Sequence, residues 1–430
     1  MKKLKDSGVE WIGEIPADWK VIKNKYLLSL LYSGGTPSVS NNDFYCFEGG
    51  TPFVSISDMS TVDYVLSTQK RLTDSGLKDK NLKVLPIGTI LYSIYATVGA
   101  VSELKIAAAI SQAMLALQVN SKVDKSFYKY NLAAMKDYIF SNANGNTQFN
   151  LNAEKVKNFY FVLPNVATQH HIANYLDRKC AEIDAIIAKQ QQIIEKLKEY
   201  KLSVITEAVT KGLDPNVPMK DSGVEWIGKV PENWQLSHIG NLVEMGSGGT
   251  PDRKKTEYWE NGNIPWMSSG EINNEYIYST IEQITELGLQ NSNAKILPVN
   301  TVMLGLIGQG KTKGLAAILK NEVCCNQNLA YLIADEKFLH YRYLFYCFKA
   351  MYFYMRGLVG ESQAGIYSYF LKKLYIPLPD TERQIKISDY LDAKCKAIKT
   401  TIAVRESIIE RFTDYKRTLI YEIVTGKREV

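Results

Sequence analysis

Hydrophobic residues recur at every seventh position in two long stretches of the chain, and mostly polar residues lie between them. Each stretch begins just after a proline and contains neither proline nor glycine until Gly212 in the first and Gly426 in the second. A proline before a helix and a glycine after it are typical start and stop signals, and Asn165 and Asp380 can cap the first turns. The pattern therefore predicts two long helices that end at these glycines.

A seven-residue period is typical of a coiled coil, in which two apolar positions of each heptad form the contact between helices. The polar interruptions fall at matching places, Gln190 with Arg405 and Lys201 with Lys416. We expect the two helices to pair as an antiparallel coiled coil related by a pseudo-twofold rotation. The alternative is that each helix merely covers its own domain. The residues expected in the seam are Leu176, Ile183, Ile187, Ile194, Leu197, Leu391, Ile398, Ile402, Ile409 and Phe412.

The residues ahead of each long helix show a different pattern. Short apolar runs at 51–56, 89–98 and 114–119, separated by Gly, Pro, Asn and Ser, are typical of strands. Residues 121–140 and 335–357 have the composition of helices. The sequence therefore predicts an α/β or α+β globular domain in front of each long helix.

The two halves of the chain repeat each other at an offset of 212 to 215 residues. KDSGVEWIGEIPADWK at 5–20 and KDSGVEWIGKVPENWQ at 220–235 share eleven of sixteen residues. A period of this length marks a duplicated domain, because solenoid repeats are only about 20–50 residues long. The expected organisation is a globular domain at 1–165 with a long helix at 166–212, followed by a second globular domain at 213–380 with a long helix at 381–426.

The duplication also predicts where the chain ends lie. The first helix ends near Lys211, nine residues before the second copy of the repeat begins at Lys220. Nine extended residues reach at most about 30 Å. Under a pseudo-twofold rotation Gly426 should lie likewise near Lys5, which would make the chain nearly circular.

Composition narrows the class of protein. The net charge of +6 is compatible with a polyanionic partner but does not require one. Six cysteines without a CxxC pair and only four histidines make a zinc site improbable. No secretory signal and no run of eighteen apolar residues are present, so we expect a cytoplasmic protein without a membrane partner.

Catalytic patterns are absent from the sequence. The chain has no NPPY or DPPY tetrapeptide of an adenine methylase, no glycine-rich turn for its cofactor, and no Ser/His/Asp or Cys/His arrangement. We therefore assign no catalytic residue, no metal ligand and no cofactor to this chain.

The segment from Gly305 to Thr312 fits the GxxxxGK[ST] pattern of a phosphate-binding loop. That loop needs a strand before it and a long helix after it, whereas Gly314 and a strand-like run at 329–333 follow here. We interpret the segment as a basic, glycine-rich loop that faces DNA through Gln309, Lys311 and Lys313. An ATP-dependent enzyme built on this loop is the alternative from a different class.

Polar, glycine-containing loops recur at equivalent places in both globular domains, and their Gln, Asn, Arg and Lys side chains could read bases or neutralise phosphates. The two SGGTP segments can equally be structural turns. The remaining candidates for DNA contact are Ser33, Gly34, Gly35, Thr36, Tyr92, Tyr95, Thr97, Gln148, Ser247, Gly248, Gly249, Thr250, Arg253, Lys254, Lys255 and Gln363.

Three repeated motifs give the whole chain a family resemblance. They are W-[IL]-G-x-[IV]-P-x-x-W at Trp11–Trp19 and Trp226–Trp234, the SGGTP segments, and QxxIxxYLDxKC at Gln169–Cys180 and Gln384–Cys395. With these motifs the chain resembles the specificity subunit of type I restriction–modification enzymes.

The resemblance implies two target-recognition domains that each read one half of a split sequence in double-stranded DNA, and a helical spacer that sets the gap. It also implies a non-catalytic subunit that joins two methylase and two restriction subunits, which would bind S-adenosylmethionine, ATP and Mg²⁺. Because the loops of the two halves differ, the target should be asymmetric. The specificity subunit of a type IIB-like system and a stand-alone architectural DNA binder are the alternatives.

Overall fold

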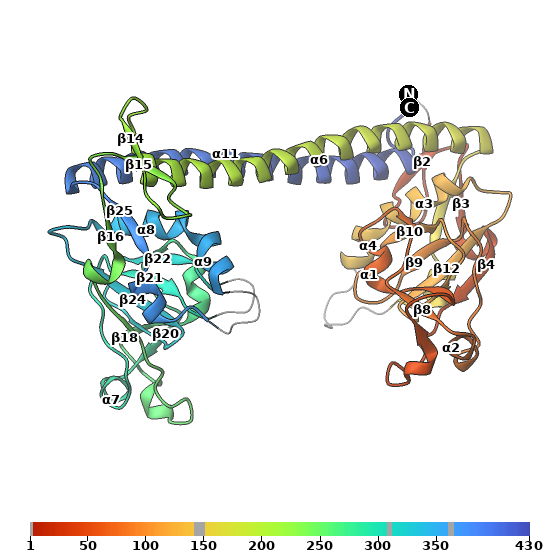
Figure 1. Ribbon diagram of the computed structural model, residues 1–430. Coiled ribbons are helices and arrows are strands. Elements are labelled where there is room, and N and C mark those ends of the chain that lie inside the picture. The colour runs from red at the N-terminus through yellow and green to blue at the C-terminus, as the bar shows by residue number, and fades with distance from the viewer. Residues whose placement is uncertain (1–2, 142–150, 308–311, 360–364) are drawn as a thin grey trace. The chain divides into compact units, whose positions relative to one another are not determined.

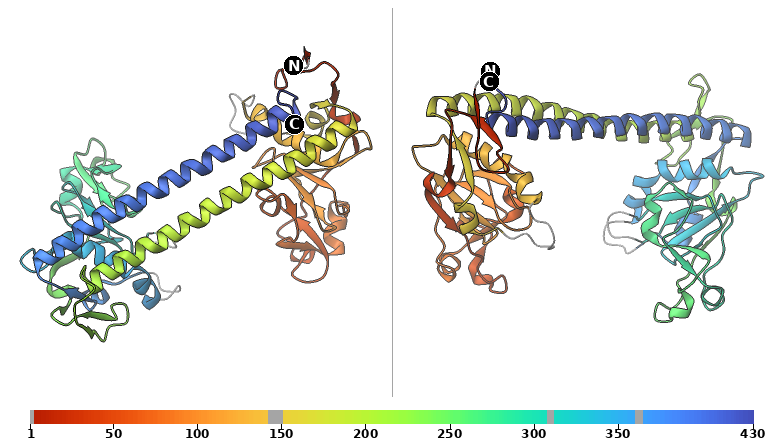
Figure 2. Two further views of the ribbon diagram at one scale, coloured as in Figure 1. Left: turned by 90° about the horizontal axis from the view of Figure 1, so that it is seen from above. Right: turned by 180° about the vertical axis from the view of Figure 1, so that it is seen from behind.

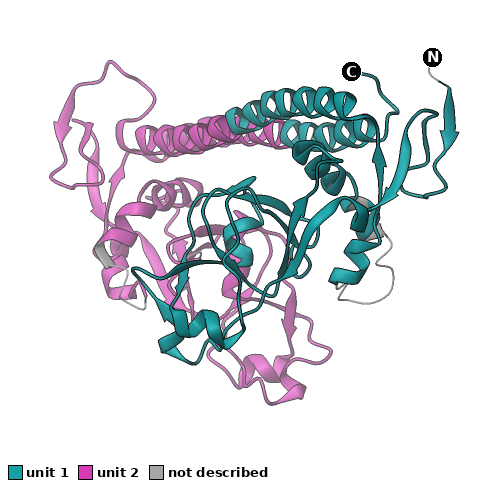
Figure 3. Cartoon of the chain, turned by 90° about the vertical axis from the view of Figure 1, so that its right-hand side faces the viewer, with its two compact units in different colours: residues 1–190, 407–430 teal, residues 191–406 magenta. Residues whose placement is uncertain are grey.

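The structure is a computed structural model that describes residues 3–141, 151–307, 312–359 and 365–430. The chain forms two compact units (Figure 3). Unit 1 contains residues 1–190 and 407–430, and unit 2 contains residues 191–406. Each unit therefore combines one globular body, by which we mean everything outside the long helices, with the first part of one long helix and the last part of the other.

The two long helices begin and end as the sequence predicts. They are α6 (Val166–Lys211) and α11 (Thr381–Val424) (Figure 1). The Asn165 carboxamide oxygen accepts a hydrogen bond from the Thr168 amide at 2.9 Å, and the Asp380 carboxylate accepts one from the Arg383 amide at 2.8 Å. Gly212 and Gly426 follow the helix ends with φ of +79° and +75°, a conformation that costs glycine little.

Within each unit the two helices pack against each other in opposite directions (Figure 2). In unit 1, Ile183 of α6 shares a core with Leu419 of α11, and the Lys416 ammonium pairs with the Asp184 carboxylate at 2.6 Å. In unit 2, Val204 shares a core with Leu391. Of the predicted seam residues, Leu176, Ile183, Ile194, Leu391 and Ile398 are buried, and Ile187, Leu197, Ile402, Ile409 and Phe412 are half-buried.

The body of unit 1 contains two sheets. The larger sheet has the strand order β4-β12-β9-β10-β7, and the smaller sheet has the order β11-β6-β8-β5. The large-sheet strands are β4 (Leu28–Ser33), β12 (Met114–Val119), β9 (Ile90–Ser93), β10 (Val101–Leu104) and β7 (Tyr64–Val65), and the small-sheet strands are β11 (Ala109–Ile110), β6 (Thr51–Val54), β8 (Lys70–Leu72) and β5 (Tyr45–Cys46).

The other elements of unit 1 connect and cover these sheets. The strand pairs are β1 (Leu4–Asp6) with β2 (Glu14–Pro16) and β3 (Lys20–Lys23) with β13 (Tyr160–Leu163). The helices are α1 (Ile56–Met59), α2 (Asp74–Asp79), α3 (Lys125–Ala134), α4 (Lys136–Ser141) and α5 (Ala153–Lys157), with 3-10 turns η1 (Asn24–Tyr26) and η2 (Asn42–Phe44).

The body of unit 2 repeats the strand order of the larger sheet, whereas its smaller sheet has three strands in the described residues where that of unit 1 has four. Its larger sheet reads β17-β24-β21-β22-β19, and its smaller sheet reads β20-β18-β23. In both units the last pair of the larger sheet is parallel, β10 with β7 and β22 with β19. The strands are β17 (Val243–Ser247), β24 (Leu329–Ala334), β21 (Val302–Gly305), β22 (Ala316–Leu319), β19 (Tyr276–Ile277), β20 (Glu282–Ile284), β18 (Ile264–Met267) and β23 (Cys324–Cys325).

The remaining elements of unit 2 also have counterparts in unit 1, although η5 is a 3-10 turn where unit 1 has the helix α1. Strand β14 (Met219–Asp221) pairs with β15 (Lys229–Pro231), and β16 (Gln235–His238) pairs with β25 (Tyr375–Leu378). The helices and turns are α7 (Glu286–Gln290), α8 (Tyr341–Ala350), α9 (Tyr352–Val359), α10 (Ser368–Lys372), η3 (Ile239–Asn241), η4 (Thr256–Tyr258) and η5 (Ser269–Asn273). The duplication read from the sequence is therefore a duplication of the fold.

Sequence pattern placed most elements correctly but not all their bounds. The run at 114–119 is β12, whereas only the first part of the run at 89–98 is a strand. Strand β9 ends at Ser93 because the chain then turns, with Ala96 at a φ of +61°. The single helices expected over 121–140 and 335–357 are each two shorter helices. Among the described residues, none of the helices combines the length and the hydropathy that crossing a bilayer requires.

A buried glutamine fastens each body to its long helix. The Gln169 side chain is 1% exposed; its oxygen accepts from the Asp124 amide at 2.8 Å, and its nitrogen donates to the Pro164 carbonyl at 2.9 Å. Gln384 does the same at the equivalent place, accepting from the His340 amide at 2.8 Å and donating to the Pro379 carbonyl at 2.8 Å. These bonds tie the first turn of each helix to the segment ahead of α3 or α8.

A tyrosine–aspartate pair repeats the fastening about two turns further along each helix. The Tyr130 hydroxyl donates to the Asp177 carboxylate at 2.7 Å, and the Tyr346 hydroxyl donates to the Asp392 carboxylate at 2.5 Å. Burial raises the pKa of Tyr130 and Tyr346, and the hydrogen bonds to the carboxylates raise it further. The phenols therefore stay protonated and keep donating.

Unit 2 also has an ionic fastening between its body and its helices. The Glu275 carboxylate, just ahead of β19, pairs with Lys201 of α6, Lys349 of α8 and Lys399 of α11. Burial alone would raise the pKa of Glu275, but the Lys349 and Lys399 ammonium groups outweigh it and lower the pKa to about 2. The body of unit 2 is thereby bound to both of its helix segments by one carboxylate.

The glycine that follows each long helix packs against a tryptophan ring of the same unit. An added Cβ at Gly212 would lie 3.1 Å from the Trp234 ring, and one at Gly426 would lie 2.9 Å from the Trp19 ring. Gly426 also packs against Pro16, which pairs with Leu4 in the β1–β2 hairpin. The two ends of the chain therefore lie together in unit 1, as the near-circular arrangement predicts.

The glutamine fastening gives a stability prediction. Gln169→Leu leaves the Asp124 amide and the Pro164 carbonyl buried without their partner, and each unsatisfied group costs about 1–3 kcal/mol. We expect unit 1 to lose about 2–4 kcal/mol in urea unfolding. The matched control is Gln191→Leu, at an exposed position of the same helix, which should change stability by less than about 0.5 kcal/mol. Equal effects of the two substitutions would contradict the fastening.

Candidate nucleic-acid interface

Several predicted contact residues of unit 1 meet at one edge of its larger sheet. Ser33 at the end of β4 and Tyr92 near the end of β9 both pair with Leu115 near the start of β12. The loops that follow β4 and β9 therefore emerge side by side. Between them lies the segment 111–114, whose backbone bonds both loops: the Ile94 amide donates to the Ala113 carbonyl at 2.9 Å, and the Gly34 amide donates to the Met114 carbonyl at 3.4 Å.

Unit 2 has the same edge. Ser247 of β17 pairs with Ala330, and Gly305 of β21 pairs with Leu329 at the start of β24. The Leu306 amide donates to the Asn328 carbonyl at 2.9 Å, which holds the following loop against the segment 326–328. Each unit therefore presents one loop edge, which we define as the SGGTP segment, the loop after β9 or β21, and the segment between the two sheets at 111–113 or 326–328.

The glycines of the SGGTP segments are structural. A side chain at Gly34 would overlap the carbonyl oxygens of Ile110 and Ser111, and one at Gly248 would overlap the carbonyl of Cys325. The amide of Gly35 donates to Ile110 at 3.1 Å. Close backbone contact between the two sheets therefore accounts for these glycines, and Gly248 and Gly249 are buried. Ser33 and Ser247 are exposed at the edge, with Thr36 and Thr250 half-buried beside them.

An exposed glutamine lies at the centre of each loop edge, and the sequence analysis did not single out either one. They are Gln112 and Gln327, which are 215 residues apart. The backbone N–H of Gln112 donates to the Thr36 hydroxyl at 3.4 Å, and the Thr250 hydroxyl donates to the carboxamide oxygen of the Gln327 side chain. A glutamine carboxamide can bond adenine through two atoms. The shared offset was the signal in the sequence that could have revealed them.

Of the predicted contact residues in and beside the loop after β9, two are exposed and one is buried. Tyr95 is 41% exposed and Thr97 is exposed, and the Ser93 hydroxyl donates to the Thr97 carbonyl, which fixes the turn. Tyr92 is 0% exposed and belongs to the core, where burial raises its pKa. A strand residue facing the core cannot reach a groove of DNA, so the structure corrects the expectation for Tyr92. Gln148 lies outside the described residues.

The basic loop of unit 2 is a hairpin connection between β21 and β22. Strand β22 begins at Ala316, where a phosphate-binding loop would need a long helix, so the structure does not favour the ATP-binding alternative. Lys313 is 8% exposed, and its carbonyl accepts from the Arg356 guanidinium at 3.1 Å. Lys313 is therefore part of the packed body and not a surface contact. Gln309, Lys311 and Gln363 lie outside the described residues.

The basic run after the second SGGTP segment is exposed but partly engaged. The Arg253 guanidinium stacks on the Trp259 ring at 3.7 Å and forms a two-pronged ion pair with Glu282, which raises the pKa of the guanidinium. The Lys255 ammonium donates to the Tyr258 hydroxyl at 3.0 Å. Lys254 is exposed. Because Glu282 offsets the charge of Arg253, Lys254 is the residue of the run best placed to neutralise a phosphate.

Comparison with known families and structures agrees with this architecture. Residues 16–199 and 231–408 match the type I restriction modification DNA specificity domain. The MjaVIII specificity subunit of Methanocaldococcus jannaschii is 23% identical, over 97% of this chain and 94% of that protein. The MjaIX specificity subunit of the same organism is 33% identical, and that match covers 38% of each chain.

Solved structures share the fold at low sequence identity. A chain from a type I restriction–modification system matches with a TM-score of 0.72 at 14% identity, over 96% of this chain and 99% of the other. The HsdS subunit of Thermoanaerobacter tengcongensis matches with a TM-score of 0.51 at 14% identity, over 98% and 100% of the two chains. A duplicated body of this topology is thus the architecture of a DNA specificity protein, and the chain belongs to the family of type I restriction–modification specificity subunits.

The exposed glutamines give a prediction for specificity. Gln327→Ala should weaken discrimination by about tenfold or more at one position of one half of the target, because a two-atom bond to a base contributes about 1–3 kcal/mol. Sequencing of the methylated bases in DNA exposed to the variant complex measures this. Gln235→Ala, an exposed position on β16, is the control and should leave the target unchanged. An unaltered half-site in Gln327→Ala would exclude Gln327 from base contact.

Proposed function

We propose that this chain is the non-catalytic subunit that gives a restriction–modification complex its sequence specificity, by reading a split, asymmetric target in double-stranded DNA. The observation that carries the proposal is the contrast between the two bodies. The strand order of their larger sheets is the same, whereas their loop edges differ. Two bodies of one plan with different edges suit two half-sites of different sequence.

Differences at the loop edge support an asymmetric target. Unit 2 carries the basic run Arg253-Lys254-Lys255 after its SGGTP segment, where unit 1 has Val39-Ser40-Asn41. The exposed loop of unit 1 presents Tyr95 and Thr97, which have no basic charge. Contacts to phosphate fix the position of a protein on DNA, and contacts to base edges specify the sequence. The two units should therefore differ both in their contacts to phosphate and in their contacts to base edges.

The long helices are the proposed spacer between the half-sites. What supports this role is that α6 is unbroken from Val166 to Lys211 although unit 1 ends at Gln190, and α11 is likewise unbroken from Thr381 to Val424. Half-sites on one face of DNA are centred about 34–36 Å apart. The intervening bases would carry no sequence requirement.

The proposed partners are two methylase subunits and two restriction subunits. In this proposal they bind S-adenosylmethionine, ATP and Mg²⁺, and this chain contributes only positioning. Support comes from the surface elements that recur in both units, because a repeated surface suits a partner present in two copies.

Changing the length of the helices tests the proposal. Wild-type chain with its methylase should methylate a two-part target. Duplicating one heptad in each helix, residues 184–190 and 399–405, adds about 10 Å at 1.5 Å per residue, which should widen the gap by about three base pairs at 3.4 Å per step. Both half-sites should stay the same, as read from sequencing of methylated bases.

The control is an insertion of seven glycine and serine residues between Pro215 and Asn216, outside the helices, which should leave the gap unchanged. A contiguous target for the wild-type chain would contradict the proposed function. An unaltered gap after the heptad duplication would contradict the spacer role alone.

A further inference from the structure

One glutamine recurs at the centre of both loop edges although the edges otherwise differ. Gln112 and Gln327 are 215 residues apart, and the other residues that the two edges have in common are glycine, proline, serine and threonine. Glutamine is therefore the one shared side chain that has a donor and an acceptor on separate atoms. A residue of this kind in both units suits a feature that both halves of the target have in common.

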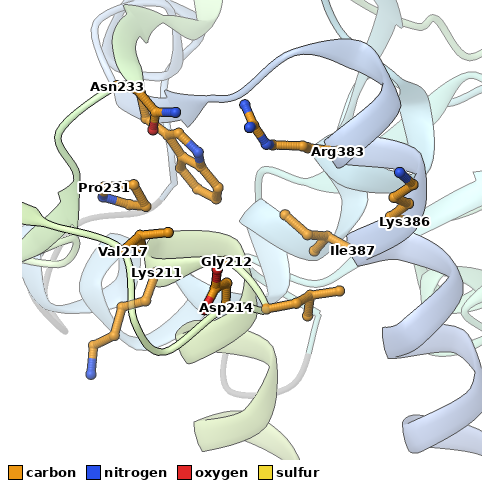
Figure 4. A pocket seen from close by; sticks show the side chains of 11 residues that line it. Lys211, Gly212, Asp214, Val217, Pro231, Asn233, Arg383, Lys386 and Ile387 are labelled. Carbon is orange, nitrogen blue, oxygen red and sulfur yellow. The ribbon is translucent and has the colours of Figure 1, made fainter.

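Most residues that the two units share serve the fold. Pro231 and Ile387, for example, line a hollow at the end of α6 (Figure 4), and their counterparts Pro16 and Ile172 line a hollow at the end of α11. Both isoleucines are 2% exposed. The two glutamines of the loop edges are exposed instead, so packing does not account for their recurrence.

Each glutamine occupies the same position in a tight turn between the two sheets of its body. In unit 1 the Met114 amide donates to the Ser111 carbonyl at 3.4 Å, and in unit 2 the Leu329 amide donates to the Asn326 carbonyl at 3.3 Å. Such a bond closes a four-residue turn, of which the glutamine is the second residue. The first and fourth residues of both turns are buried, whereas the second is exposed. Each turn therefore presents its glutamine to solvent.

The backbone on both sides of each turn is held in place. The Ser111 amide donates to the Val54 carbonyl of β6 at 3.0 Å, and the Asn326 amide donates to the Met267 carbonyl of β18 at 3.1 Å. On its other side each turn accepts a hydrogen bond from the loop after β9 or β21, at 2.9 Å in both units. A side chain on a fixed turn loses less conformational freedom when it binds a partner.

The two carboxamides keep the atoms that a contact to a base needs. In the described part of the chain, the Gln112 carboxamide has no hydrogen-bond partner, since its bond to Thr36 comes from the backbone. The carboxamide oxygen of Gln327 accepts from the Thr250 hydroxyl. A carboxamide oxygen can accept two hydrogen bonds. The oxygen of Gln327 therefore retains one site, and Thr250 limits the rotation of the group.

Adenine is the base that matches such a carboxamide. In the major groove it presents an acceptor at N7 and a donor at N6, which pair with the nitrogen and the oxygen of a glutamine side chain. Guanine presents two acceptors there, and cytosine and thymine each present a single polar group. A two-atom bond from glutamine therefore selects adenine over the other three bases.

We propose that Gln112 and Gln327 are specificity-determining residues that bond the same base in the two half-sites, the adenine that is to be methylated. The inference rests on the proposed function, in which two copies of one methylase act on the two halves. Both halves then need the same base where methylation occurs, however much they differ elsewhere. A base leaves the stack before chemistry is done on it, so the glutamine bond belongs to the first binding step, while the adenine is still paired.

A base analogue tests the proposal. Sequencing of methylated bases first defines the target of the wild-type chain with its methylase. Synthetic duplexes then carry 7-deazaadenine, which lacks N7, at the methylated position of one half, and fluorescence anisotropy measures binding of the complex without S-adenosylmethionine. The analogue should weaken wild-type binding about fivefold, because one hydrogen bond is lost. In Gln112→Ala the analogue should change binding by less than about twofold in one half and still about fivefold in the other, and Gln327→Ala should show the reverse.

The matched controls are Gln69→Ala and Gln235→Ala, at exposed positions outside the loop edges, and both should keep the fivefold effect in both halves. Gln112→Glu and Gln327→Glu provide a second form of the test, since they keep the shape of the side chain but replace the donor nitrogen by oxygen. An analogue effect that persists in the alanine and glutamate variants, or that disappears equally in the controls, would overturn the role of the glutamines. A wild-type chain that directs no methylation to a two-part target would instead overturn the proposed function.

Discussion

The buried glutamine at the start of each long helix is the contact on which the arrangement of each unit depends. Gln169 bonds the start of α6 to the residue ahead of α3, and Gln384 bonds the start of α11 to the residue ahead of α8. The two side chains are 1% and 0% exposed. A buried carboxamide must satisfy its donors and acceptors, so its geometry permits one orientation of body and helix. A specificity protein needs such rigidity, because a loop edge can read bases only from a fixed position.

The duplication separates structural residues from residues that define a target. Positions that are alike in the two units, such as Asp177 with Asp392, make the same contacts within each unit. The basic run that begins at Arg253 has no basic counterpart in unit 1 and lies beside the loop edge. A third group, which includes Tyr200 and Tyr415, is alike in both units yet exposed. In the proposed function, the first group serves folding and the second serves DNA reading.

Much of the fold could be predicted because its signals are local. Heptad spacing and terminal caps define the helices, and Asn165 and Asp380 cap them as expected. The candidate interface was harder to predict, because exposure depends on which way a strand residue faces. Tyr92 and Lys313 were expected at the surface and are buried. Gln112 was missed because strand pairing between distant segments brings it to the loop edge.

Replacing one body by a copy of the other tests the central claim most directly. Residues 16–163 and residues 231–378 occupy equivalent places and have the same length. Residues 231–378 can therefore be replaced by a second copy of residues 16–163. Sequencing of methylated bases should then show a target in which both halves have the sequence read by unit 1, with an unchanged gap. Persistence of the original second half-site would contradict the claim that each body reads one half of the target on its own.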